Sequence, residues 1–447
     1  MGPPAVRTRG RYPPGSSVLV RLLPPEPPMP PIQVSDRVAN LQPSVTVAVA
    51  NRARALKRAG KDVLSFALGE PDFDTPDRIK QAAIDALWNG QTKYMPTLGD
   101  PETRQAIADK FTEENRIPGL TADHVGISAG AKHTIYGLCQ CLFDAPATGE
   151  APAEAVIPVP AWVSYKPIVE LSGGRVVEVD TGPESDFKIS PEQLRAALTP
   201  RSRALFLNSP SNPCGTMYTE GELHALATVI AEACETVCPQ LVILSDEIYE
   251  KIVYGGIEAF SIGSIPEVAE RTVTINGVSK AFAMTGWRAG YCGIPGEFGK
   301  TLIQSLGTLQ GQMTTNITSF VYPAIRTALA ECADDVERMR AAFASRAKRI
   351  KAGLDRIEGL SCPEPTGAFY AFVNVKAHFG KTSAGGRTID SGLSFCEALL
   401  DEHHVAVIPG EDFGGCGREH VRISFACSEA QIDQGLERID AFVRGLG

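Results

Sequence analysis

One lysine stands out at residues 276–291, which read N-G-V-S-K-A-F-A-M-T-G-W-R-A-G-Y, because the run around it is otherwise mostly small and apolar. The amine of this residue, Lys280, has an ordinary pKa near ~10.4. In a poorly solvated pocket the neutral amine becomes accessible, and a Schiff-base nucleophile needs that form. The stretch therefore predicts a lysine that reacts with a carbonyl compound.

Two neighbours of Lys280 indicate what that carbonyl compound carries. Ser279 directly precedes the lysine, and Arg288 follows in the same stretch. A hydroxyl donor and a planar guanidinium together suit a phosphate dianion. A Schiff-base lysine beside a phosphate clamp points to pyridoxal 5′-phosphate as the cofactor.

This cofactor needs a carboxylate at its pyridine nitrogen and hydrogen-bond donors at its ring oxygen. Asp246 follows an apolar run in S-D-E-I-Y, and Tyr249 comes three residues later. Asn212 lies in N-S-P-S-N-P-C-G-T after another apolar run, where its amide can donate to the ring oxygen. Two alternatives stay open, because Asp246 also suits a helix cap and Asn212 a plain turn.

Four further residues suit the phosphate, the ring face and a substrate. The small residues of Gly130-Ala131-Lys132 precede a helical stretch, so backbone N–H groups can approach a phosphate there. Trp162 is a candidate cover for the ring, with a core tryptophan as the alternative. Arg422 lies in the apolar run V-R-I-S-F, and such an arginine normally has a carboxylate partner, from the protein or from a substrate.

The elements around these residues predict how they come together. Asn212, Asp246 and Lys280 are equally spaced along the chain, each just after a short apolar run. Helical segments separate most of these runs, which favours a mostly parallel sheet covered on both faces. A parallel sheet would bring the three residues to one edge. The runs lie at residues 125–127, 155–157, 204–207, 241–244 and 272–275.

The rest of the chain predicts further elements. Apolar positions at helical spacing indicate a helix at 76–89, and one long charged helix is expected at about 322–357. Strand-like runs follow at 368–375, 405–408 and 421–425. We therefore expect a smaller α+β domain at the end of the chain.

Composition narrows the function. The net charge of −9 does not favour nucleic-acid binding. No run approaches ~18 uninterrupted apolar residues, so no membrane span is expected. The 11 cysteines contain no C-x-x-C pair and suggest a reducing compartment, and no metal site is expected. His403-His404 is interpreted as a helix end.

The first ~30 residues are rich in proline and arginine and carry no acid before Glu26. Such a segment cannot bury enough apolar surface to order itself. A transit-like segment and a plain disordered extension are both compatible with it, so plastid and cytoplasm both stay open. We expect four segments: this extension (1–31), an arm with part of the small domain (32–68), a large domain (69–322), and a small domain that begins with a long connecting helix (323–447).

Six motifs in this order closely resemble the class I aminotransferases of fold type I. They are G-E-P-D-F-D-T-P (69–76), K-Y-M-P-T-L-G (93–99), N-S-P-S-N-P-C-G-T (208–216), S-D-E-I-Y-E (245–250), S-K-A-F-A-M-T-G-W-R (279–288) and G-A-F-Y (367–370). The similarity runs from about residue 34 to the C-terminus. It implies an α/β fold with a mostly parallel seven-stranded sheet in the large domain, a smaller α+β domain, and a homodimer with shared active sites.

The resemblance implies a role for each site residue. Lys280 would form the Schiff base and act as the catalytic base. The expected cofactor contacts are Asp246 at the ring nitrogen, Tyr249 and Asn212 at the ring oxygen, Trp162 on the ring face, and Ser279, Arg288, Ala131 and Lys132 at the phosphate, with Tyr94 reaching the phosphate of the neighbouring subunit. The expected substrate contacts are Arg422 at the α-carboxylate, Gly69 through its backbone, and Trp162 and Asn212.

Two positions resemble the prokaryotic-type aspartate aminotransferases, which include enzymes that also use prephenate. Lys132 matches a lysine for the distal carboxylate of dicarboxylic substrates, and Thr46 matches a threonine near the same end. Cys214 departs from the usual threonine, with at most a modest expected effect. We therefore expect aspartate and 2-oxoglutarate to react by ping-pong transamination, with prephenate left open as a further substrate.

Three rival functions remain from the sequence. Lys132 could instead be a solvated lysine, and the enzyme would then act on alanine or aromatic amino acids. A lyase of the aminocyclopropane-carboxylate synthase type shares the scaffold. A catalytically silent binding protein is the non-enzyme alternative, and the intact set of Lys280, Asp246, Arg288 and Arg422 argues against it.

Overall fold

The computed structural model describes residue 2 and residues 33–41, 45–147 and 149–447, and leaves the side chains of 45 and 46 undescribed. The chain divides into two units, Met1–Leu41 and Gln42–Gly447. The first unit has one described helix, α1 (Asp36–Ala39). Apart from Gly2, the predicted extension at 1–31 lies outside the described residues. The paragraphs below concern the second unit.

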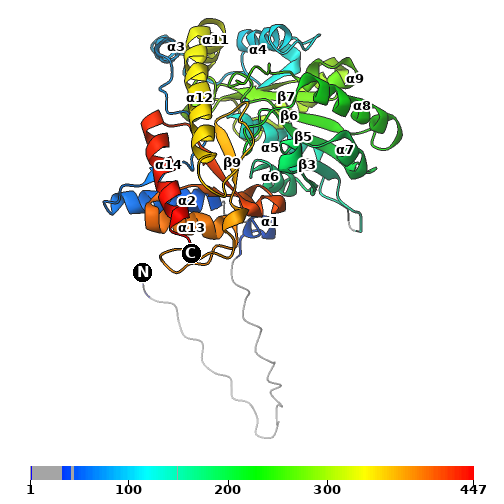
Figure 1. Cartoon of the computed structure of the whole chain (residues 1–447). Helices are drawn as coiled ribbons and strands as arrows, with labels where there is room; N and C mark the ends of the chain where they lie inside the picture. Colours follow the sequence, from blue (N-terminus) through cyan, green and yellow to red (C-terminus); the bar gives the residue numbers. More distant parts are fainter. Residues whose placement is uncertain (1, 3–32, 42–44, 148) are drawn as a thin grey trace, which may run out of the picture. The chain divides into compact units, whose positions relative to one another are not determined.

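A seven-stranded sheet forms the centre of this unit (Figure 1). Strand β8 runs antiparallel to both of its neighbours, and the other pairs are parallel. The predicted α/β fold with a mostly parallel sheet is thus confirmed. In order across the sheet, the strands are β2 (Val125–Ser128), β8 (Gly290–Gly293), β7 (Thr272–Gly277), β6 (Val242–Asp246), β5 (Ser202–Asn208), β3 (Glu154–Val159) and β4 (Arg175–Asp180).

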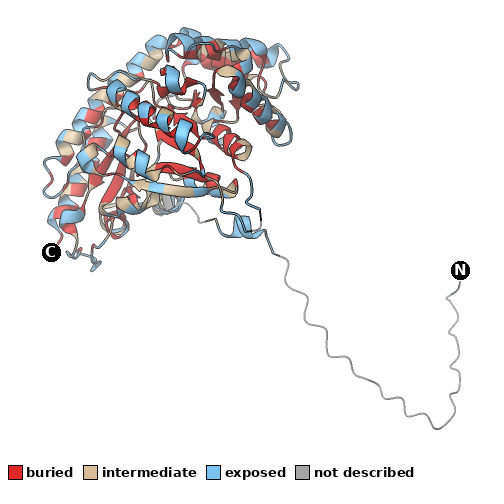
Figure 2. Ribbon diagram, turned by 90° about the vertical axis from the view of Figure 1, so that its right-hand side faces the viewer, coloured by how far each residue is buried: buried red, intermediate tan, exposed pale blue. Residues whose placement is uncertain are grey.

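Alternation along the strands buries both faces of the sheet. In β5, Ala204 and Phe206 join the core on one face, whereas Leu205 and Leu207 join the core on the other. Figure 2 shows these central strands as buried, beneath helices with exposed outer faces. The helices of the first face are α5 (Ala131–Leu142), α6 (Tyr165–Leu171) and α10 (Gly296–Gly311). Those of the second face are α7 (Pro191–Ala197), α8 (Glu220–Thr236) and α9 (Pro266–Ala269).

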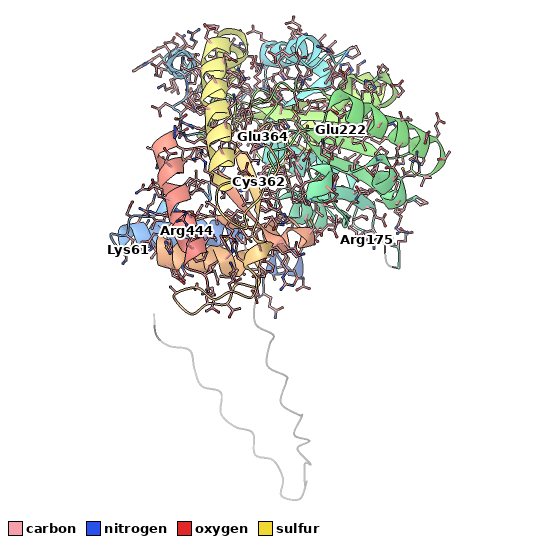
Figure 3. All side chains as sticks on the ribbon, viewed as in Figure 1. Lys61, Arg175, Glu222, Cys362, Glu364 and Arg444 are labelled. Carbon is pink, nitrogen blue, oxygen red and sulfur yellow. The ribbon has the colours of Figure 1, made fainter. Side chains whose placement is uncertain are left out.

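Local signals set several helix starts. Helix α8 begins with a capping box, in which Thr219 Oγ1 accepts from the backbone N–H of Glu222 and the Glu222 carboxylate accepts from the N–H of Thr219. Figure 3 labels Glu222 on this helix.

The edge strand β4 is joined to β3 by an ion pair, in which the exposed Arg175, also labelled in Figure 3, pairs with the buried Glu154 of β3.

A third apolar core combines residues of strands β2 and β8 with three helices: α3 (Asp77–Trp88), α4 (Pro101–Glu113) and α11 (Val321–Glu331). The predicted helix at 76–89 is confirmed as α3.

The C-terminal part contains a second, smaller sheet system. Antiparallel strands β11 (Ile408–Pro409), β12 (His420–Ser424) and β9 (Tyr370–Asn374) form one sheet, and β1 (Leu64–Ser65) pairs in parallel with β10 (Val405–Ala406). The accompanying helices are α2 (Val45–Arg58), α12 (Ala333–Leu354), α13 (Gly392–His403) and α14 (Glu429–Arg444). The 3-10 turns of the unit are η1 (Ala122–His124), η2 (Pro183–Ser185), η3 (Ile262–Ser264), η4 (Thr285–Trp287), η5 (Lys376–His378), η6 (Gly410–Phe413) and η7 (Gly415–Glu419).

Three predictions differ from this structure. The single helix at 322–357 is wrong: Cys332, with φ −110° and ψ 21°, separates α11 from α12. The run at 405–408 divides into β10 and β11, which pair with different strands. Strands β4 and β8 were not predicted, because β4 is a half-exposed edge strand and β8 reads G-Y-C-G. The predicted helix end at His403-His404 is confirmed, with His404 as the left-handed cap of α13.

Within the described ranges, no helix is both long enough and apolar enough to cross a bilayer.

Candidate active site

Three neighbouring strands deliver the predicted residues to one edge of the sheet. Asp246 ends β6 and is in register with Asn208 at the end of β5, four residues before Asn212. Lys280 follows the end of the adjacent strand β7. These ends meet at a cavity of about 350 Å³. Of the predicted site residues, it is lined by Gly69, Ala131, Lys132, Trp162, Asn212, Asp246, Tyr249, Ser279, Lys280, Arg288 and Arg422.

Lys280 enters this cavity without a carboxylate as its hydrogen-bond acceptor. Its Nζ donates to the Gly69 carbonyl oxygen at 2.6 Å. Burial lowers the pKa of Lys280 to about 8, against a smaller opposing effect of the Glu70 carboxylate. The neutral form of this amine, which a Schiff-base nucleophile requires, is therefore more accessible near neutral pH than in an ordinary lysine.

Asp246 is a buried carboxylate held by two donors. Its Oδ2 accepts from the Tyr165 hydroxyl at 2.7 Å, and its Oδ1 from the Ile248 backbone N–H at 3.2 Å. Burial raises the pKa of Asp246, and these two hydrogen bonds oppose the rise. The residues after Asp246 form turns, so the helix-cap alternative is wrong. The carboxylate is fixed at the cavity wall, where it can face a cationic ring nitrogen.

Tyr249 and Asn212 approach from neighbouring loops. The Tyr249 hydroxyl lies 2.8 Å from the Tyr370 hydroxyl, and both are buried. Asn212 Oδ1 accepts from Arg422 Nη1 at 3.0 Å. Because its oxygen is occupied by the guanidinium, the Asn212 amide presents its N–H groups as donors.

Arg422 is a buried cation that bonds to neutral oxygens. Besides its contact with Asn212, its Nη2 donates to the Ala67 carbonyl at 2.6 Å. Its Nε has no hydrogen-bond partner among the described residues. Burial lowers the pKa of Arg422 as well. A buried guanidinium with an unused donor suits an incoming carboxylate.

The opposite wall of the cavity has the features of an anion site. Helix α5 begins at Ala131, so the N–H groups of its first turn are directed out of the helix start. Gly130 precedes it with φ 89°, and a side chain there would collide with the Arg288 guanidinium. Arg288 donates to the Thr285 carbonyl at 2.8 Å, and Ser279 lines the same cavity.

Lys132 and Trp162 form a pair at the cavity. The Lys132 amine lies 4.9 Å from the centre of the Trp162 ring. Partial desolvation of the amine and the nearby Arg288 charge lower the pKa of Lys132, although the residue as a whole remains exposed to solvent. Besides Lys280 and Arg288, the cavity thus contains Lys132 from helix α5 and Arg422 from strand β12.

Two predicted site residues are not placed in the cavity. Tyr94 is 87% exposed and does not line it. Thr46 belongs to helix α2, but its side chain lies outside the described residues. Cys214 is buried, and burial raises its pKa well above the ordinary range.

Among the cavity residues that sequence reasoning missed are two tyrosines, Tyr165 and Tyr370. Tyr165 lies three residues after the predicted Trp162, and Tyr370 ends the motif G-A-F-Y, so their surroundings were visible in the sequence. Their partners, Asp246 and Tyr249, are far away in sequence, and that distance hid the roles.

Comparisons with known proteins agree with this geometry. The family model described as aminotransferase class I and II matches residues 61–439. The aspartate/prephenate aminotransferase of Cereibacter sphaeroides is 42% identical over 414 residues, which is 92% of this chain and 99% of that protein. The aspartate aminotransferase of Geobacillus stearothermophilus is 42% identical over 413 residues, again 92% and 99%. The crystal structure of the Rhizobium meliloti aspartate aminotransferase matches with a TM-score of 0.87 at 38% identity, covering 93% of this chain and 100% of that one.

Proposed function

Because this chain belongs to the class I and II aminotransferases, we propose that it transfers the amino group of L-aspartate to 2-oxoglutarate, giving oxaloacetate and L-glutamate. The observation that carries the proposal is the cavity into which Arg422 brings a buried guanidinium and Lys132 a second cation. Two cations on separate elements suit a substrate with two carboxylates. We extend the proposal to prephenate as a further amino acceptor, giving arogenate, since a relative carries that activity in its name.

We propose pyridoxal 5′-phosphate as the cofactor, and the donor set fits it. Ser279, Arg288 and the start of α5 offer the phosphate N–H, hydroxyl and guanidinium donors. The collision that a side chain at Gly130 would cause shows how closely that cradle is shaped. When bound, the cofactor supplies an electron sink that stabilises the carbanion formed at the substrate Cα.

The chain's own residues then position the reactants and move protons. Asp246 would hold the ring nitrogen of the bound cofactor in its protonated form, and Tyr249 and Asn212 would donate to the ring oxygen. Lys280, with its lowered pKa, would take up and release a proton at the substrate Cα. Arg422 orients the α-carboxylate.

The substrate ends and the ring face complete the assignment. Trp162 covers the ring, and Gly69 contributes a backbone contact to the substrate. Lys132 binds the distal carboxylate, with Thr46 near the same end.

We further propose a homodimer in which Tyr94 reaches the phosphate site of the second subunit. Its exposure of 87% in the single chain supports this role, because an aromatic side chain with a polar tip suits an interface.

The proposed domains remain an arm and part of the small domain at 32–68, a large domain at 69–322 and a small domain at 323–447. Three separate apolar cores around the seven-stranded sheet support the large domain.

A substrate panel tests the proposed specificity. Replacing Lys132 with glutamine removes one cation and keeps the length of a polar side chain. We expect kcat/KM with aspartate to fall about 10- to 150-fold, equivalent to the ~1.5–3 kcal/mol of a charge-assisted hydrogen bond. Activity with alanine or phenylalanine should change little, and a panel of donors with 2-oxoglutarate and prephenate measures both.

The matched control is Lys166→Gln, which removes an exposed lysine that pairs with Glu178 on the same face of the sheet. It should leave the whole panel unchanged. Equal losses with aspartate and alanine in the Lys132 variant would exclude the distal-carboxylate role and favour the alanine or aromatic alternative. Release of product without any acceptor would identify a lyase.

A further inference from the structure

The segment Gly69–Thr75 has no regular secondary structure, and its first residue, Gly69, lines the cavity. At its start, the Gly69 carbonyl accepts from Lys280 Nζ at 2.6 Å. Its next residue, Glu70, accepts a hydrogen bond from the Thr285 hydroxyl. At its end, Thr75 Oγ1 donates to the Ala283 carbonyl at 2.6 Å. One side of this segment is therefore fastened to the loop that contains Lys280.

The other side of the segment is fastened to helix α12 by an arginine. Arg346 forms a bidentate pair with Asp72, with Nη1–Oδ1 at 2.6 Å and Nη2–Oδ2 at 2.9 Å. The Arg346 side chain is 9% exposed, and its guanidinium lies over the rings of Phe73 and Phe343 at 4.9 and 5.3 Å. Planar bidentate pairs of this kind fix orientation as well as distance.

Only two residues, Glu70 and Pro71, separate Gly69 from the anchored Asp72. A short irregular segment has no ladder hydrogen bonds of its own to define its path, so its side-chain anchors define it. Gly69 cannot be braced by a side chain of its own, because a Cβ there would fall on the Tyr370 hydroxyl. The position of the Gly69 carbonyl therefore depends on its neighbours, among which the Asp72–Arg346 pair is a bidentate ion pair.

We propose that Arg346 is a positioning residue for the transamination site, and that it acts through Asp72 to fix where the Gly69 carbonyl and Glu70 meet Lys280. The inference rests on the proposed function, since it concerns the amine that takes up the cofactor. Arg346 lies in the C-terminal part of the chain and touches neither the cavity nor Lys280. The pair thus connects helix α12 to the reactive amine.

The direction of the effect follows from the groups that face Lys280. The Gly69 carbonyl and the carboxylates of Glu70 and Asp246 favour the charged amine, whereas burial, Arg422 and Arg288 disfavour it. Releasing the segment removes the carbonyl and Glu70 from that balance. The pKa of Lys280, about 8 in the intact protein, should then fall.

The test uses the full chain freed of cofactor and then mixed with pyridoxal 5′-phosphate over a range of pH. Imine formation needs the neutral amine, so the rate of appearance of the visible band should rise through a midpoint near pH 8. We expect Arg346→Met and Asp72→Asn to lower that midpoint equally, by about one pH unit, which is roughly tenfold in neutral amine at a fixed lower pH. Arg346→Met keeps apolar packing against Phe73 and Phe343.

Arg349→Met is the matched control, because Arg349 lies three residues along α12 and pairs with Asp433 at 2.8 Å on the exposed side. Its midpoint should equal that of the unmodified protein. The double variant of Arg346 and Asp72 should show the same shift as either single variant, since both remove one pair.

Unchanged midpoints in the folded Arg346 and Asp72 variants would overturn the proposal. If Arg346→Met does not fold, the Asp72→Asn variant alone decides, because that carboxylate is partly exposed. Failure of the unmodified protein to form any visible band would instead reject the proposed cofactor, so the two failures are distinguishable.

Discussion

Strand β6 ends between two sites that contain the same residue types, a lysine and buried carboxylates. On the cavity side, Lys280 donates to a backbone carbonyl, and Asp246 is held by a phenol and an amide. On the other side, Lys110 is 3% exposed and forms an ion pair with Glu250. Asn115 donates to both Glu250 and Glu247 there, at 2.7 and 3.0 Å.

The difference between the sites lies in the partner of the amine. A buried ammonium beside a carboxylate is stabilised in its charged form and serves packing and orientation. A buried amine beside a carbonyl loses that stabilisation and becomes available as a nucleophile and base. We call the site that contains Lys110 the rear network. Its residues are Lys110, Asn115, Ser245, Glu247, Glu250 and Ser261.

The largest expected effect comes from removing the reactive lysine on the cavity side. Lys280→Ala should lower kcat by at least ~10³-fold, because it removes both the covalent attachment and the proton-transfer base. The visible band of the enzyme-bound cofactor should also be lost. Absorbance and steady-state kinetics measure the two effects, and Lys110→Met should retain the band. Near-normal activity of the Lys280 variant would mean that another residue performs this chemistry.

The second-largest expected effect is a loss of stability when the buried lysine of the rear network is removed. Lys110→Met leaves the Glu250 carboxylate without its buried cation, so we expect a loss of about 3 kcal/mol in the free energy of unfolding. The folded variant should keep its kcat within about twofold, because Lys110 does not line the cavity. Urea unfolding and assays on the folded fraction check both values. Lys251→Met is the control, since that partly exposed pair with Glu114 should contribute less than ~1 kcal/mol.

A smaller expected effect is the contribution of Glu247 to the pH dependence of the free energy of unfolding. Burial, with the neighbouring Glu250, raises the pKa of Glu247 from 4.5 to about 8. Between these values the unfolded chain has released a proton that the folded protein retains, so this group makes stability fall as pH rises from about 4.5 to 8. Glu247→Gln should flatten that fall in urea unfolding at a series of pH values. An unchanged pH dependence would mean that Glu247 ionises normally in the folded protein.

Lys280 should show the opposite slope at higher pH in the cofactor-free protein. Its pKa is lowered to about 8 from 10.5, so the unfolded chain binds the proton more readily in that window. The lowered pKa of Lys280 reduces the free energy of unfolding by its full amount below pH 8. This reduction becomes smaller as pH rises toward 10.5, so the free energy of unfolding increases with pH in this window. Lys280→Met should abolish this increase, and the Lys110→Met variant should retain it.

Much of the cavity was predictable because its chemistry depends on residue types at strand ends. The apolar runs before Asn212, Asp246 and Lys280 predicted adjacent parallel strands, and β5, β6 and β7 are adjacent. The rear network was not predictable, since Lys110 and Glu250 come from elements 140 residues apart. The break at Cys332 was also hidden, because a helical pattern of apolar residues continues on both sides of it.

The sequence by itself determined the reactive lysine, the cationic and carboxylate side chains of the cavity, and the parallel order of the strands that deliver them, because these follow from residue type and local periodicity. Only the tertiary structure decided which lysine donates to a backbone carbonyl and which pairs with a carboxylate. Lys280 and Lys110 are both lysines near apolar neighbours in the sequence. Their difference arises from whether folding brings a carbonyl or a carboxylate to the amine, and that partner comes from a distant part of the chain.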